Sequence, residues 1–288
     1  MPLYRDTSKK TSLWVPILVV LALIAGIYIW QKGEKTTEPA QVEQPAVSEK
    51  KQPLPQEAEK PVIRFPVPEA TVQVEEETKI TPEPVKQLKP LPALDESDAS
   101  IQDELNGLYN QQQFGEMFLL EAIVRHFVVT VDNMTGPKLP QRYVFTKPPT
   151  GKFAIKTDTN NIEFIDPENY KRYAGFIKLA ETVDTGKLVS VYVHYYPLFQ
   201  KAYEELGYPN RYFNDRLIEV IDHLLMTPVV QGPIKLVRPK VYYQFANPEL
   251  EALSAGQKIL IRIGYDNAVK VKAKLREIRK ALTTLRRQ

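Results

Sequence analysis

Residues 192–213 read YVHYYPLFQKAYEELGYPNRYF, which places eight aromatic residues in 22 positions. Such a stretch is either a surface of exposed rings that binds a ligand or a core built largely from tyrosine. Wound at 100° per residue, a helix over 185–206 collects its apolar residues on one face and leaves Pro197 with the polar residues opposite. That face consists of Leu188, Val191, Tyr192, Tyr195, Leu198, Phe199, Ala202 and Leu206. The pattern therefore predicts a core helix, capped by Asp184 and ended by Gly207, with Tyr196 and Tyr203 at the edge of the apolar face.

Helical spacing continues on both sides of this stretch. Apolar residues recur at helical intervals over 95–110, 116–132, 214–227 and 266–285, and the cap signals Asp166-Pro167, Asn247-Pro248 and Ser254-x-x-Gln257 begin further helices. Residues 133–152 contain four prolines and two glycines, which indicates an extended surface loop. The segments KFAIKT and IEFID alternate apolar and polar residues across DTNN, which predicts a β-hairpin. The fold class expected for residues 93–288 is therefore mainly α with one small β-hairpin.

An apolar stretch near the N-terminus has the length of a membrane span. Residues 13–30, LWVPILVVLALIAGIYIW, contain no charged residue and have a tryptophan near or at each end. This length and these interfacial rings are typical of a transmembrane helix, and no small-residue cleavage site of a signal peptide follows. Basic residues in 1–12 favour a cytoplasmic N-terminus. We therefore predict a single-pass inner-membrane protein whose C-terminal domain is periplasmic.

Residues 31–92 differ in composition from everything that follows. They hold eleven of the 24 prolines, a single aromatic residue, Phe65, and a single glycine, Gly33. A segment so poor in apolar side chains cannot offset its ordering entropy, so we predict a disordered, proline-rich linker. Extended as polyproline II at about 3.1 Å per residue, it would reach roughly 190 Å.

The residue types that catalysis requires are missing or scattered. The chain has no cysteine, which excludes disulfides and thiol chemistry, and its three histidines, His126, His194 and His223, have no ligand spacing. Metal-protease, serine-hydrolase and phosphate-loop motifs are absent from the sequence. Paired carboxylates such as Asp132 with Glu121 could serve a glycosidase if the fold placed them across a cleft. We predict no catalytic residue, no metal site and no cofactor.

Four blocks of sequence carry a resemblance to a known family. They are LPALDESDASI, VVTVDNMTGPKLP, YPLFQKAYEELGYP with NDRLIEVIDHLLMTP, and AGQKILIRIG followed by NAVKVKAKLREIR. In this order, over about residues 90–283, they resemble the bacterial domain of unknown function 3014 family. The resemblance implies an envelope protein with an N-terminal membrane anchor, and it implies no activity.

Three classes of function remain open. The first is a non-catalytic envelope adaptor or scaffold that binds another protein, and Arg142, Tyr143, Tyr196 and Tyr203 are its predicted binding residues. The second is binding to peptidoglycan or an anionic lipid surface through the last helix, because residues 266–288 carry eight Lys and Arg against two acidic residues. Lys272, Arg276 and Arg279 represent that basic face. The third is a cell-wall enzyme. Nucleic acid is not an expected partner of an exported domain.

Overall fold

The computed structural model describes residues 63–68, 90–106 and 115–285 of the chain. The elements in these ranges are η1 (Leu94–Glu96), α2 (Ser97–Asn106), α4 (Ile123–Asn133), η2 (Gln141–Tyr143), β1 (Ile155–Thr157), β2 (Glu163–Ile165), α5 (Glu168–Lys171), α6 (Ala174–Thr182), α7 (Thr185–Glu205), α8 (Phe213–Leu225), β3 (Leu236–Val237), β4 (Gln244–Phe245), α9 (Pro248–Glu251), α10 (Ala255–Arg262) and α11 (Tyr265–Thr284). The mainly helical fold with a small hairpin is confirmed. Of the helices described, none has the length and apolar character to cross a membrane. The span predicted for residues 13–30 lies outside the described ranges.

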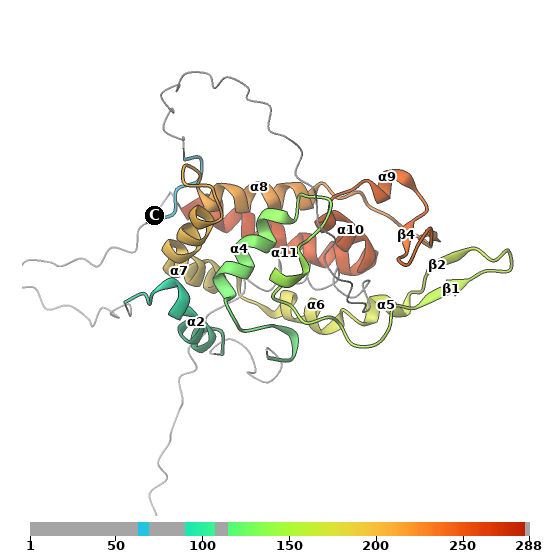
Figure 1. Cartoon of the computed structure of the whole chain (residues 1–288), viewed down its shortest axis with the longest axis horizontal. Coiled ribbons are helices and arrows are strands. Elements are labelled where there is room, and N and C mark those ends of the chain that lie inside the picture. The colour runs from blue at the N-terminus through green and yellow to red at the C-terminus, as the bar shows by residue number, and fades with distance from the viewer. Residues whose placement is uncertain (1–62, 69–89, 107–114, 286–288) are drawn as a thin grey trace, which may run out of the picture.

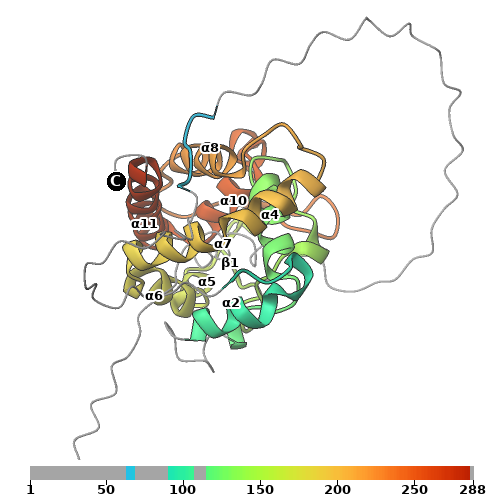
Figure 2. The same ribbon diagram turned by 90° about the vertical axis from the view of Figure 1, so that its left-hand side faces the viewer.

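Helix α7 lies at the centre of the domain. It contacts α4, α8 and α11, and Figure 2 shows it between α11 and α4. Its bounds agree with the predicted helix, and the Asp184 carboxylate accepts a hydrogen bond from the backbone N–H of Lys187 at 2.8 Å. Pro197 lies inside the helix on the exposed side, as the winding of the sequence predicted.

The aromatic residues of α7 are core residues. Phe199 lies within 6.0 Å, centroid to centroid, of the rings of Phe127 on α4, Phe213 on α8 and Tyr192 two turns earlier. Such contacts add about 0.5–1.5 kcal/mol per pair to the burial of the rings themselves. The tyrosine-rich stretch therefore holds three helices together.

The strands form two small antiparallel pairs at one end of the domain (Figure 1). In the predicted hairpin Ile155 pairs with Ile165, and in the second pair Leu236 lies opposite Phe245. Only the first of these was predicted from the sequence. A hydrogen bond of 3.0 Å from the N–H of Ile165 to the carbonyl of Ile234 joins the pairs. Beneath them lies a second, smaller apolar core that comprises Ile165, Ile234, Leu236, Phe245 and Ile261.

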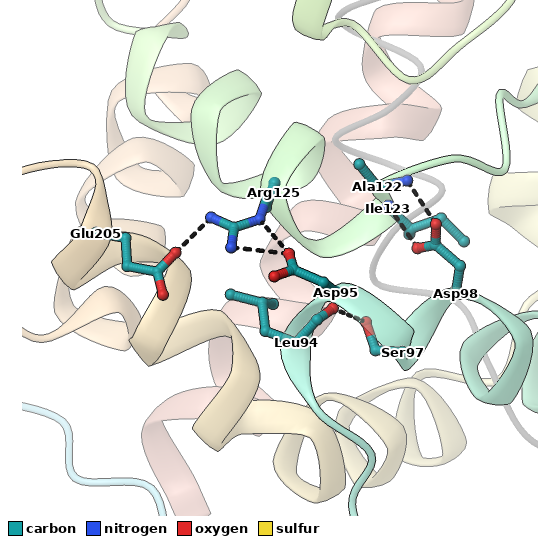
Figure 3. A network of polar contacts seen from close by, with 8 residues as sticks. All are labelled: Leu94, Asp95, Ser97, Asp98, Ala122, Ile123, Arg125 and Glu205. Carbon is teal, nitrogen blue, oxygen red and sulfur yellow. Dashed lines mark hydrogen bonds and ion pairs between the residues drawn. The ribbon is translucent and has the colours of Figure 1, made fainter.

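The helix predicted over 116–132 is interrupted: residues 115–117 are helical, and α4 begins only at Ile123. Phe118 forms a β-bridge with Thr146, and Ala122 adopts the left-handed conformation with φ 48°, so the chain cannot continue as one helix. The Asp98 carboxylate of α2 accepts hydrogen bonds from the N–H groups of Ala122 and Ile123, at 2.6 and 2.9 Å (Figure 3). A tertiary strand contact and a cap from another helix thus override the helical periodicity.

Two segments predicted to lie free of the core contribute to it. In the proline-rich loop after α4, Leu139, Val144 and Phe145 are buried in the main core. In the linker, Phe65 and Val67 pack against that same core from the outside. Residues 63–68 of the predicted linker therefore contact the domain, and residues 31–62 and 69–89 lie outside the described ranges.

Candidate functional site

The two predicted binding residues on α7 are not exposed rings. Tyr203 is only 1% exposed, and its ring stacks on Tyr208 at 4.7 Å and tilts against Phe213 at 5.5 Å. The half-buried Tyr196 donates its hydroxyl to Oε1 of Gln200 at 3.1 Å. Burial raises the pKa of each tyrosine to about 12. The placement of Tyr203 at the edge of the core was wrong, because residues 207–213 fold back and cover it.

The loop pair Arg142 and Tyr143 does lie at the surface. Both belong to η2, and the guanidinium carbon of Arg142 sits 4.6 Å from the centroid of the Tyr143 ring. The other contacts of Tyr143 fix it to α4: its carbonyl accepts from the hydroxyl of Thr130 at 3.1 Å, and its ring meets His126 edge-on. A role of this pair in binding stays a prediction.

The basic face predicted on the last helix is largely committed to internal contacts. Lys272 is only 8% exposed, and its ammonium donates to the carbonyl of Thr227 at 2.5 Å. Burial, and then the nearby charge of Arg276, lowers the pKa of Lys272. Arg279 forms an ion pair with Asp222 on α8, whose Oδ2 lies 2.9 Å from Nη2. Of the three predicted residues, Arg276 alone is fully on the surface, so they do not form one charged patch.

Asp132, the carboxylate that the sequence pairs with Glu121, is bound to Arg216 and lies far along the helix from its predicted partner. Oδ1 of Asp132 accepts from Nε of Arg216 at 2.9 Å, and the same guanidinium donates to the carbonyl of Asp132 and to the hydroxyl of Thr135. Glu121 precedes α4 and Asp132 lies near its end, so about nine residues of helix, about 14 Å at 1.5 Å per residue, separate them. Glycosidase carboxylates lie about 5–9.5 Å apart.

An open groove lined mainly by apolar side chains lies beside the hairpin. It has a volume of about 850 Å³ and runs between the hairpin, the loop 230–234 and the junction of α10 with α11. Its buried lining residues are Ile165, Ile234, Ile263 and Gly264, and its more exposed ones include Phe164, Pro167, Tyr170, Pro233 and Tyr265. We refer to this feature as the hairpin groove. Mostly apolar concave sites of about 300–1,000 Å³ are typical of ligand binding.

A glycine and an asparagine shape the wall of the hairpin groove. Gly264 has φ 90° and ψ 159°, and a Cβ atom at this position would lie 2.6 Å from Cγ of Tyr170. The side-chain amide of Asn267 donates to the carbonyls of Tyr170 and Ile263, at 3.0 and 2.9 Å. The Tyr170 ring is therefore held flat over the backbone between α10 and α11. Burial raises the pKa of Tyr170, with a smaller contribution from the charge of Asp166.

The charged residues of the hairpin groove balance one another. Two lysines, Lys156 and Lys171, and two aspartates, Asp158 and Asp266, line it. Asp158 is occupied in its own turn, where Oδ1 accepts from the N–H groups of Asn160 and Ile162 at 2.9 Å each. Among the residues described, no group of three or more His, Asp or Glu is placed to hold a metal ion. The groove thus offers apolar contact and orientation rather than an acid–base or metal constellation.

Exposed apolar side chains extend the hairpin groove along one side. Val229, in the loop after α8, is 65% exposed, and Val269 on α11 is also exposed. Both line a smaller pocket, with Lys272, that shares Val230, Gly264 and Tyr265 with the groove. This surface was not predicted from the sequence. Its only local signal is the run MTPVV, residues 226–230, in which apolar residues lie on both sides of Pro228 after the end of a helix.

The comparisons with known proteins agree with the resemblance read from the sequence. Residues 123–279 match the model of a family described as protein of unknown function, DUF3014. No curated protein and no solved structure matches the chain. The matched range runs from the start of α4 into α11 and includes every element that lines the hairpin groove. Because it covers more than half of the sequence, the chain belongs to the DUF3014 family.

Proposed function

We propose that this protein is a membrane-anchored envelope adaptor whose helical domain binds another protein without catalysing a reaction, and that the hairpin groove is its binding surface. The observation that carries the proposal is the groove of about 850 Å³, which the exposed side chains of Val229 and Val269 continue on the open surface. Apolar side chains left exposed next to a concave apolar site mark surfaces that other proteins cover.

The chemistry of the groove defines the partner. Its floor is made of isoleucines and its rim carries two lysines and two aspartates, so a partner segment of low net charge with two or three apolar anchors fits it best. The rings of Tyr170 and Tyr265 add flat apolar area with polar tips, which favours a protein segment over a purely hydrocarbon ligand.

The location of the domain in the envelope rests on the sequence. The predicted span at 13–30, the linker that follows and the basic N-terminus support an inner-membrane protein with a periplasmic domain. In this arrangement the groove would be carried away from the bilayer and could meet partners fixed elsewhere in the envelope.

The alternative, binding to peptidoglycan or anionic lipid through α11, has less support. Lys272 donates a hydrogen bond to the carbonyl of Thr227, and Arg279 forms an ion pair with Asp222. Of the three predicted residues, this leaves Arg276 exposed. A membrane-surface helix needs a continuous charged face beside its apolar one.

A pair of matched variants tests the proposal. Val229→Asp places a charge beside the groove, and Val241→Asp places one at an equally exposed valine, 64% against 65%, in the turn between β3 and β4. Neither should change stability by more than about 0.5 kcal/mol, because both side chains are solvated. Affinity capture of the full chain from crosslinked membranes should recover a specific protein with Val241→Asp and lose it with Val229→Asp. Equal recovery with both variants would refute the groove as the binding surface.

A further inference from the structure

A short piece of the linker lies bound on the folded domain. Residues 63–68, IRFPVP, contain Phe65, the single aromatic residue of the linker. The N–H groups of Arg64 and Phe65 donate to the two carboxylate oxygens of Asp215, at 3.0 and 2.8 Å. The carbonyl of Phe65 accepts from the side-chain amide of Asn214 at 2.8 Å. Two adjacent residues of α8 therefore bind three main-chain groups of the segment.

Contacts within the domain fix the side chain of Asn214 in the orientation that binds an extended chain. Asn214 is 0% exposed, and its Oδ1 accepts the hydroxyl of Tyr192 at 3.2 Å, which leaves its Nδ2 directed at Phe65. Asn214 lies in the first turn of α8, whose N-cap is Tyr212, and that helix has no side-chain cap bond. The side chain of Asn214 is thus used for the segment and not for its own helix.

The segment has the features of a peptide ligand. Pro66 and Pro68 fix φ and carry no N–H, so the free chain is already biased towards the extended form. The side chains of Phe65 and Val67 pack against the main core. Main-chain hydrogen bonds combined with alternating side-chain contacts are how domains recognise extended peptides.

We propose that Asn214, Asp215 and the adjoining apolar surface form a peptide-binding site for an extended aromatic–proline segment, and that residues 63–68 of the same chain are its reversible internal ligand. Residues 69–89 connect the segment to the domain and could span up to about 65 Å, so the site is within reach of its own chain. A linker of this kind gives the segment an effective concentration of about 1 mM at the site. The site is therefore closed unless the segment is released.

Binding of the segment sets how far the domain travels from its predicted anchor. When the site is filled, residues 31–62 alone separate the predicted span from the domain, and when it is empty the whole of 31–92 does. This consequence rests on the predicted span, whereas the peptide-binding site does not.

Competition with a synthetic peptide tests the proposal on the full chain in detergent. The probe is a fluorescent peptide of residues 60–70, KPVIRFPVPEA. Phe65→Ala in the protein weakens the internal ligand by removing its aromatic side chain, and it changes no residue of the folded domain. We expect the Phe65→Ala protein to bind the probe about tenfold more tightly than the unmodified protein does, because an internal segment at about 1 mM competes with a peptide of about 100 µM affinity. Adding Asp215→Asn to Phe65→Ala should abolish this gain in affinity for the probe.

Three outcomes would overturn the proposal. The first is no binding of the probe by the Phe65→Ala protein when its thermal unfolding is unchanged. The second is equal affinity with and without Phe65→Ala, because the site would then be empty in the native chain. The third is transfer of the segment between molecules: if amide protection of Arg64 and Phe65 falls on dilution, the occupant comes from a second copy. The internal ligand is supported if the amide protection of Arg64 and Phe65 does not depend on protein concentration and falls at least tenfold in Asp215→Asn.

Discussion

Gly264→Ala is the most informative single change near the hairpin groove. The backbone at Gly264, with φ 90° and ψ 159°, lies in a region that glycine alone adopts readily. A Cβ there would meet Cγ, Cδ1 and Cδ2 of Tyr170 at 2.6, 2.7 and 2.9 Å. The substitution should therefore strain the chain between α10 and α11 and displace the Tyr170 ring from the groove wall.

The expected loss of stability is the sum of two effects. Holding an alanine in this backbone region costs about 1–3 kcal/mol. Forcing a methyl group against a packed ring costs a further ~1–3 kcal/mol. A total near ~4 kcal/mol is a large share of the ~5–15 kcal/mol by which domains are stable. At roughly 2–4 °C per kcal/mol, the Tm of the domain should fall by roughly 8–16 °C.

Gly207→Ala is the matched control. Gly207 also has a positive φ, 112°, but a Cβ atom added there would have no atom of the described residues within 4 Å. Thermal unfolding followed by circular dichroism should show Gly264→Ala losing about 1–3 kcal/mol more than the control. Combining Gly264→Ala with Tyr170→Ala should remove that difference, measured against Tyr170→Ala alone. Equal losses in the two glycine variants would refute the ring contact.

Asp98→Ala should lower the free energy of unfolding by about 1–2 kcal/mol, because the Asp98 carboxylate caps α4. The control Asp95→Ala breaks an exposed ion pair and should lower it by less than about 1 kcal/mol. Equal losses of the two variants in urea titrations would contradict the cap. Burial raises the pKa of Tyr203 from 10.0 to about 12, so its contribution to stability is present below pH 10 and should be lost as the pH rises towards 12. Tyr203→Phe should make that alkaline loss shallower, and an unchanged slope would count against it. Burial lowers the pKa of His126 and His194 below 6.5, so the unfolded chain binds protons first and stability should fall as the pH drops below 6.5. Replacing both histidines by glutamine should reduce the shift of the urea midpoint between about pH 7.5 and 5.5.

Much of the fold could be predicted because its signals are local. The helical winding of the aromatic stretch, the Asp184 cap and the capping box of Ser254 with Gln257 each depend on residues within one or two turns. The hairpin follows from alternation across a turn that Asp158 stabilises. The helices appear in the structure within a residue or two of where the sequence places them, and the first hairpin strand begins three residues later than the segment KFAIKT.

The failures share a different cause, because they depend on residues far apart in the chain. The start of α4 is set by Asp98 and by the bridge between Phe118 and Thr146, neither of which periodicity reveals. The charge of Lys272 is turned inward by the carbonyl of Thr227, 45 residues earlier. A helix winding shows which residues share a face, but not which of them a neighbouring loop will cover.

The surfaces proposed for binding could not be predicted for the same reason. The hairpin groove is assembled from residues 156–174, 230–234 and 263–267, which come together only in the folded chain. The bound linker segment did leave one signal, since Phe65 is the single aromatic residue among the polar and proline-rich residues 31–92. Its partner residues Asn214 and Asp215 lie about 150 positions away.

Site-specific photocrosslinking tests the central claim, that the domain binds a protein through the hairpin groove. A photoreactive amino acid is placed at Val229 beside the groove or at Val241 in the β3–β4 turn, two positions of nearly equal exposure, in cells that express the full chain. The account predicts one discrete crosslinked protein from Val229 that is absent from Val241. The same crosslinks from both positions, or none from Val229, would contradict it.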